Sequence, residues 1–322
     1  MTSTRFVRSA STLALALLIA SPANAQFGRL RRAAEQAAGT MDPARLLRTP
    51  PPIATALPDA VWAVDSLDGF DPAESEAQPM SVLQRTPNGG FILQKGLYAQ
   101  QNQSYCLHAG THGPGGGDGY LYAPPRGSAD DHVIAILRNS VAHPEIPQRP
   151  VQLLLWAIVA RAKFEDLQHG LQPVAAQLLT PAQLLTLNRS AWELAGPALD
   201  RAMSGLPAPA QQALRAESEL RGMLTSTTST FDDMERVAVL AGLAPRGEGS
   251  RDVPRGRWSR HPDGYYVRYI PTSYPSTRME VWVPEGSPAI GRELDNAMHI
   301  AVPGNTSRQR LIQSARVQGG GH

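Results

Sequence analysis

The apolar pattern of this 322-residue chain changes character twice, and this change restricts the fold more than any other feature. From residue 60 to 109, short alternating runs separated by turn signals are typical of β-strands. Beyond a short strand at 120–122, apolar residues recur at helical spacing to about residue 243. Strand-like runs then return. The order predicts an α+β fold with an N-terminal β segment, a central helical region and a C-terminal β meander.

Turn residues place several of the expected elements. Pro87-Asn88-Gly89-Gly90 is a hairpin turn signal, and a strand at 104–109 is expected to carry Cys106. Pro150 is expected at the first position of a helix. The apolar residues of that helix follow the i, i+3, i+4, i+7, i+8 rule and are Val151, Leu154, Leu155, Ile158 and Val159. This stripe predicts that the helix packs against the strand that carries Cys106.

The later elements are placed in the same way. Thr230 with Asp233 three residues later predicts a helix start, with the helix ending near Ala244-Pro245. A turn at 261–264 separates the first two strands of the expected meander. The three strands are predicted at 257–259, 265–270 and 279–283.

The N-terminus has the features of a secretory signal. Arg5 and Arg8 form a basic region, residues 13–20 are apolar, and Ala23-Asn24-Ala25 is a typical cleavage site. We predict cleavage after Ala25 and a periplasmic or secreted location. The rest of the chain is expected to divide into four parts: a leader or linker over 26–57, a β plus helical domain over 58–245, a C-terminal β meander over 246–300 packed on it, and a tail over 301–322. A first strand is expected near Val61.

Charge excludes some partner classes. The formal net charge is +2, and loss of Arg5 and Arg8 with the signal leaves 28 basic against 28 acidic residues. Nucleic-acid binding driven by net charge is therefore not expected. No later segment is apolar over the length that a transmembrane helix needs.

Two residues need a chemical explanation. Cys106 is the only cysteine, so an exported chain has no partner for it within the molecule. Gln152 lies on an apolar helix, where a buried carboxamide must be hydrogen-bonded or used. One reaction accounts for both: the sulfur attacks the carboxamide, ammonia leaves, and an internal thioester remains.

The local sequences around both residues match a known pair of motifs. Tyr105-Cys106-Leu107 and Val151-Gln152-Leu153-Leu154-Leu155-Trp156 resemble, in this order, the two motifs of the thioester domains of bacterial surface adhesins. The resemblance implies a bond between Cys106 Sγ and the side-chain carbonyl carbon of Gln152. It also implies adhesion at the cell envelope by covalent capture of an amine or hydroxyl on a surface protein or glycan.

Other residues are candidates for supporting roles at such a site. Proton transfer is needed as the thiol becomes an acyl donor, and histidine titrates near neutral pH. We therefore expect this role for His108, His112 or His143. Trp156 follows Gln152 by one helical turn and is a candidate lid that excludes water from the bond.

Two other functions remain open from the sequence. In a cell-envelope cysteine hydrolase or transpeptidase, Cys106 would be the nucleophile, a histidine its base, and Gln100 an oxyanion-hole donor. In a non-covalent envelope structural protein, Cys106 would pack as a small apolar residue. A thioester protein traps one amine and stops, whereas an enzyme turns over and the structural protein does neither.

The glycine-rich loop at 110–119 bears on a metal site. His108, His112 and Asp118 could bind a metal. The spacing of His108 and His112 brings two ligands together only on a helix, whereas the glycines at 110 and 113 favour a loop. We therefore expect no metal and no other cofactor. Enzyme status and oligomeric state stay open.

Overall fold

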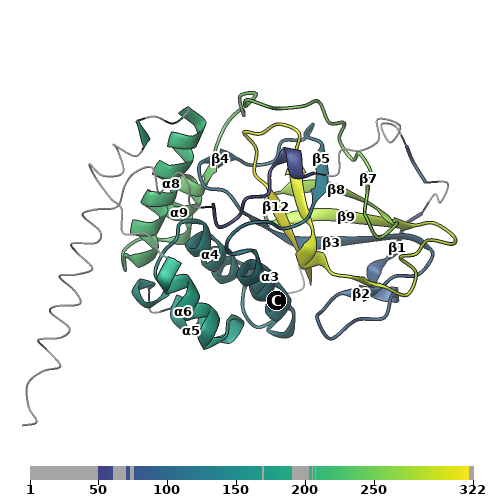
Figure 1. Cartoon of the computed structure of the whole chain (residues 1–322), viewed down its shortest axis with the longest axis horizontal. Helices are drawn as coiled ribbons and strands as arrows, with labels where there is room; N and C mark the ends of the chain where they lie inside the picture. Colours follow the sequence, from purple (N-terminus) through teal and green to yellow (C-terminus); the bar gives the residue numbers. More distant parts are fainter. Residues whose placement is uncertain are drawn as a thin grey trace, which may run out of the picture.

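The computed structural model describes residues 50–60, 70–72, 76–168, 170–190, 203–204, 206 and 208–318 (Figure 1). The expected signal, most of the expected leader, the strand expected near Val61 and the last four residues lie outside this description.

One mixed sheet of eight strands forms the β part of the fold. Its order is β5-β11-β12-β3-β9-β8-β7, and β1 pairs with β3 beside this path. The strands are β1 (Gln78–Pro79), β3 (Gly96–Cys106), β5 (Tyr120–Ala123), β7 (Ser259–Arg260), β8 (Tyr266–Ser273), β9 (Ser276–Val283), β11 (Ile300–Pro303) and β12 (Leu311–Val317). Two small pairs are β2 (Phe91–Ile92) with β10 (Glu293–Leu294), and β4 (Thr111–His112) with β6 (Val239–Leu240).

The two ends of this sheet approach each other, so it is nearly closed into a barrel. The backbone N–H of Tyr122 in β5 donates to Ser259 Oγ in β7 at 3.0 Å. Aromatic side chains also contact one another near these ends. Tyr122 Oη lies 3.0 Å from His261 Nε2, and Tyr265 Oη lies 2.7 Å from His299 Nε2.

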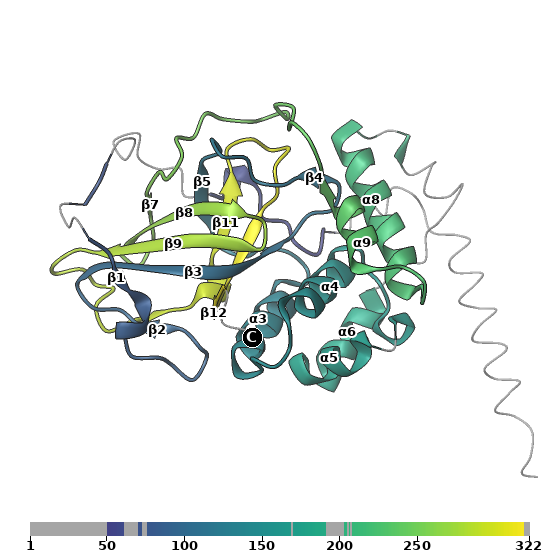
Figure 2. The ribbon, with the colours of Figure 1, turned by 180° about the vertical axis from the view of Figure 1, so that it is seen from behind.

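The helices gather on one side of the sheet, as Figure 1 and, from behind, Figure 2 show. They are α3 (Asp130–Ala142), α4 (Gln148–Val159), α5 (Leu171–Leu178), α6 (Pro181–Ser190), α8 (Ala208–Thr225) and α9 (Phe231–Ala238). Short 3-10 turns are Leu57–Asp59, Met80–Val82, Phe164–Asp166 and Asn296–Met298. In the described part of the chain, no helix combines the length and apolar character needed to cross a bilayer.

The mixed α and β content agrees with the predicted class, and α4 follows its predicted stripe. Its five expected apolar residues are all buried. The helix begins at Gln148, two residues earlier than predicted, so Pro150 is its third residue. Proline is accepted there because the first turn of a helix has no internal partners for its N–H groups.

The C-terminal layout differs from the prediction in two ways. The meander β7-β8-β9 is present, but β9 pairs directly with β3, so residues 246–300 complete the N-terminal sheet instead of packing on it. The stretch 301–322, expected to be a tail, contains β12, which lies between β11 and β3. Both faces of β12 are buried, and it includes Gln313 and Ser314, so it lacks the alternation that marks a half-exposed strand.

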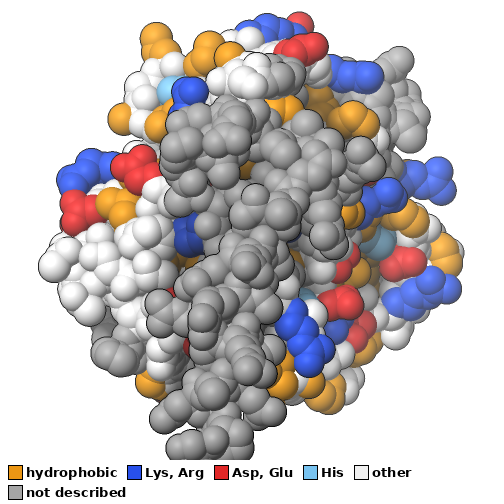
Figure 3. Space-filling view, turned by 60° about the vertical axis from the view of Figure 1, so that its left-hand side comes forward, with side chains coloured by type: hydrophobic (Ala, Val, Ile, Leu, Met, Phe, Trp, Pro, Cys, Tyr) orange, Lys and Arg blue, Asp and Glu red, His pale blue; other side chains and the backbone are white. Residues whose placement is uncertain are grey.

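Charged side chains of both signs are interspersed on the face in Figure 3, over the part that described residues cover. This distribution agrees with the nearly balanced composition.

Candidate functional site

Cys106 is the last residue of β3, at a place where one neighbouring strand stops. On one side, Cys106 pairs with Leu311 of β12. On the other side, the ladder with β9 ends at Gln103 opposite Ser276. The N–H and C=O of Cys106 on that side need other partners, because buried backbone groups are almost always hydrogen-bonded.

Two glutamines of α4 supply these partners. Gln148 Nε2 donates to the carbonyl oxygens of Ser104 at 3.1 Å and Pro275 at 2.8 Å. One turn later, Gln152 Oε1 accepts from the Cys106 N–H at 2.8 Å, and Gln152 Nε2 donates to the Cys106 carbonyl at 3.0 Å. The two carboxamides therefore continue the ladder along β3 beyond the end of β9.

This arrangement holds the Gln152 carboxamide against the residue that carries the thiol. The prediction that α4 packs beside the cysteine strand is confirmed, since both hydrogen bonds join Gln152 to Cys106. The relative exposure of Cys106 is 0% and that of Gln152 is 2%. An acyl–sulfur bond formed here would be protected from bulk water.

A cavity of about 230 Å³ lies beside Gln152. It is lined by Gln148, Arg149, Gln152, Phe231, Glu235, Tyr274, Pro275 and Gln318. Glu235 comes from α9 and Tyr274 from the turn between β8 and β9, and Tyr274 Oη donates a hydrogen bond to Glu235 Oε1. The buried carboxamide is therefore next to a space that contains a carboxylate and a phenol.

The electrostatics keep the thiol in its neutral form. Burial, and then the negative charge of Glu235, raise the pKa of Cys106 well above its usual value. Burial and the hydrogen bond to Glu235 also raise the pKa of Tyr274. At neutral pH, sulfur can attack a carboxamide here only if another group takes its proton.

Trp156, the expected lid, lies in the core and does not line this cavity. Trp156 is fully buried, and its ring stacks on that of Phe231 with centroids 5.6 Å apart and an interplanar angle of 25°. The Arg149 guanidinium lies 4.7 Å from the Phe231 ring centroid. Phe231 lines the cavity, whereas Trp156 is not among the described residues that do so. Phe231 is therefore the ring at the cavity, and Trp156 supports it.

The three expected histidines do not meet at this cavity. Arg310 Nη1 lies 2.9 Å from His108 Nε2, and burial together with Arg310 holds the pKa of His108 well below its usual range. His143 lies beside Glu145, with Nδ1 and Oε1 2.8 Å apart. His112 lines a different cavity. Among the described residues of this cavity, Glu235 and Tyr274 are a carboxyl and a phenol joined by a hydrogen bond.

Sequence reasoning missed Glu235 and Tyr274 because both are distant in the chain from either motif. The pattern at Thr230 and Asp233 did place the start of α9, and the structure confirms that capping box. The predicted meander also placed a turn after β8. No sequence signal indicated that this helix and this turn meet beside Gln152.

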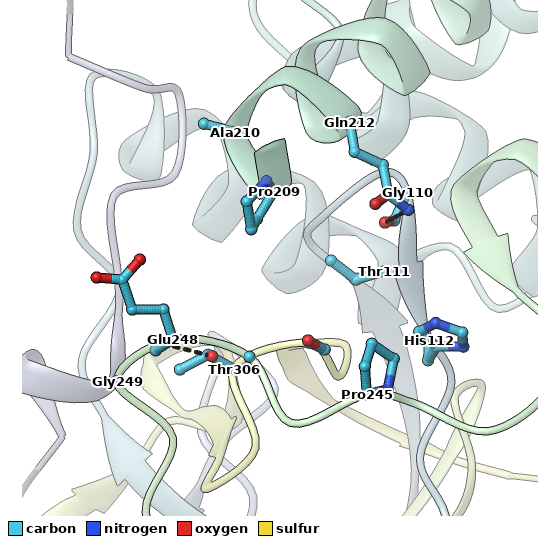
Figure 4. Close-up of a pocket in the computed structure, with 12 residues that line it drawn as sticks. Gly110, Thr111, His112, Pro209, Ala210, Gln212, Pro245, Glu248, Gly249 and Thr306 are labelled. Atoms are coloured by element: carbon cyan, nitrogen blue, oxygen red, sulfur yellow. Dashed lines mark hydrogen bonds between the residues drawn. The ribbon is translucent and has the colours of Figure 1, made fainter. Parts of the chain in front are cut away.

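A second cavity, of about 370 Å³, lies between the start of α8 and β4 (Figure 4). Its walls are tied by two side-chain hydrogen bonds: Gln212 Nε2 to the Gly110 carbonyl at 3.2 Å, and Thr306 Oγ1 to the Glu248 carbonyl at 2.8 Å. His112 lines this second cavity, but Cys106 and Gln152 are not among the described residues that line it.

The residues of the alternative metal site are held apart by other partners. His108 lies against Arg310, and Asp118 Oδ2 lies 2.9 Å from Arg308 Nε. In the described ranges, no group of three or more histidine, cysteine or acidic side chains is arranged to hold a metal ion.

Comparisons of the chain with protein-family models, with curated proteins and with solved structures found no match.

Proposed function

We propose that Cys106 and Gln152 form an internal thioester, and that this bond attaches the protein covalently to an amine or hydroxyl of a partner. The observation that carries the proposal is the pair of hydrogen bonds between the Gln152 side chain and the Cys106 main chain. They hold an electrophilic carbon against the main chain of the residue that carries the chain's single thiol, in a buried site.

The bond-forming step is an acyl transfer within the molecule. Cys106 Sγ attacks Gln152 Cδ, the S–C bond forms, and the C–N bond to Nε2 breaks. The thiol proton passes to the departing nitrogen, which leaves as ammonia. The Cys106 N–H, 2.8 Å from Oε1, stabilises the negative charge that develops on that oxygen.

The attachment step breaks the S–C bond that the first step formed. An amine or hydroxyl enters the cavity beside Gln152, attacks the acyl carbon, and returns a proton to the sulfur. The product is an amide or ester to Gln152 and a free Cys106 thiol. The partner that fits this chemistry is a surface protein or glycan at the cell envelope, in keeping with the predicted export.

A non-covalent structural protein is the second candidate, and one observation favours it. Gln148 bonds the backbone of Ser104 and Pro275 without any thiol beside it. Gln152 could complete the same ladder and do nothing more. The experiment below therefore uses Gln148 as the control for Gln152.

The hydrolase alternative has less support. Cys106 is fully buried with a raised pKa, so it is not a ready nucleophile for an outside substrate. The Gln100 carboxamide donates to Asn102 Oδ1 at 2.8 Å and to the Ala315 carbonyl at 3.0 Å. Its N–H groups therefore already donate to acceptors other than a substrate oxygen.

Reaction with methylamine separates these functions. We expect one methylamine per molecule, at Gln152 and not at Gln148, with release of the Cys106 thiol. Cys106→Ala should remove the adduct, and Gln148→Ala should keep it. Peptide mass mapping of the three proteins gives the answer. An adduct that persists in Cys106→Ala, no adduct in the wild type, or sustained turnover of an acyl substrate would overturn the proposal.

A further inference from the structure

Formation of the proposed thioester requires a proton to move between two buried atoms. The Cys106 thiol is neutral because burial and Glu235 raise its pKa. The nitrogen of Gln152 must gain a proton to leave as ammonia, since an amide anion is a very poor leaving group. A group in the cavity must therefore accept a proton from sulfur and donate one to nitrogen.

Among the residues that the structure describes, three side chains with titratable or permanently charged groups line the cavity: Arg149, Glu235 and Tyr274. The Arg149 guanidinium lies over Phe231, with Asp232 Oδ1 3.7 Å from its Nη2. It can attract a carboxylate but cannot accept a proton. Glu235 can accept one, and Tyr274 holds it in place through a hydrogen bond.

We propose that Glu235 is the proton-transfer residue of the Cys106–Gln152 reaction and that Tyr274 positions it. The inference rests on the proposed thioester. Glu235 faces the cavity from α9, and Tyr274 faces it from the turn between β8 and β9. Both line the same cavity as Gln152, and this cavity is the space that we assign to departing ammonia and an incoming nucleophile.

The proton balance closes in both directions. As the S–C bond forms, Glu235 takes the thiol proton; as the C–N bond breaks, it gives that proton to nitrogen and is a carboxylate again. During attachment, Glu235 takes the proton of the incoming amine or hydroxyl and returns it to sulfur. No oxidant, metal or further reactant is needed.

Several charged and titratable groups of the described residues surround Glu235. Tyr274 faces it from the β8–β9 turn and Arg149 from α4, and the charge of Glu235 acts on Cys106 of β3. On its own helix, Asp232 pairs with Arg149, and Asp233 pairs with Arg236. Because the step needs a carboxylate that is free to accept a proton, thioester formation should slow in acid.

The test follows ammonia loss by intact mass in freshly made protein, and methylamine capture in protein that has formed the bond. We expect Glu235→Gln to slow both by about 100-fold or more and to remove the acid slowing of ammonia loss. Tyr274→Phe should slow both less and keep the acid slowing of ammonia loss, as a positioning role requires. Asp232→Asn, a neighbouring carboxylate on the same helix, is the matched control and should change neither rate substantially.

A rescue experiment covers the case in which a variant folds poorly. In Glu235→Ala, the cavity has room for a formate ion, and added formate should restore part of the rate. A wild type that forms the bond together with a Glu235→Gln protein of unchanged rate and acid dependence would overturn the role of Glu235 alone. Absence of rescue by formate in folded Glu235→Ala would count against it too. A wild type that never loses ammonia would instead overturn the proposed thioester itself.

Discussion

At the scale of single residues, the Gln152 carboxamide is the key group of the site. It satisfies the N–H and the C=O of Cys106, which β9 leaves without a strand partner. In the proposed thioester, the same side chain supplies the carbon that the sulfur attacks. Variants of Cys106 and Gln152 can separate this proposed chemical role from the structural one.

Gln152→Ala should destabilise the protein more than Cys106→Ala. Neither variant can form the thioester, so its loss is common to both and their difference reports the hydrogen bonds. Beyond that common loss, Cys106→Ala removes one small buried group and should cost about 1 kcal/mol of unfolding free energy. Gln152→Ala leaves two buried backbone groups unpaired, at about 1–3 kcal/mol for each. Urea denaturation measures both, and equal losses would contradict the pairing described here.

At the scale of elements, α9 determines what borders the Gln152 cavity. Its first residue is Phe231, and Glu235 lies one turn further. Thr230 and Asp233 cap its start reciprocally, which the sequence pattern correctly predicted. The predicted end near residue 244 was wrong, because the chain leaves the helix at Ala238 to pair β6 with β4. Local capping chemistry is readable from sequence, whereas a helix end set by a distant strand is not.

Thr230→Ala should make the proposed thioester hydrolyse faster. The lost cap costs about 1 kcal/mol, and fraying of the first turn of α9 would move Phe231 and admit water. The rate at which the Cys106 thiol appears in buffer measures this. Thr180→Ala is the control, because Thr180 caps α6 by accepting from the Gln183 N–H at 3.3 Å, away from the cavity. Equal hydrolysis in the wild type and Thr230→Ala would show that α9 does not protect the bond.

At the scale of the whole molecule, the site depends on one sheet built from both ends of the chain. Cys106 pairs with β12 near the C-terminus. The pairing of β3 with β9 stops at Ser276, and side chains of α4 make the next hydrogen bonds along β3. The sequence predicted the meander, the turn at 87–90 and the buried stripe of α4, because each has a local pattern. The structure bears out that turn: the Thr86 N–H donates to the Gly90 carbonyl at 3.1 Å, and Gly89 has a φ of 82°.

What the sequence could not predict is the set of contacts between distant segments. Strand β12 is hidden by its buried polar residues, so 301–322 resembled a tail. Cys106 and Gln152 could be paired only because each carries a short motif. Glu235 and Tyr274 carry none, and the histidines chosen for proximity in sequence lie elsewhere in space.

The intact mass of the purified, folded wild-type protein tests the central claim most directly. Formation of the thioester removes one ammonia, so the wild type should be lighter than its processed sequence by that mass. Cys106→Ala and Gln152→Ala, prepared identically, should each have the full mass of their own sequences. A wild type of full sequence mass, with Gln152 intact and a Cys106 thiol that is alkylated once the protein is unfolded, would contradict the account.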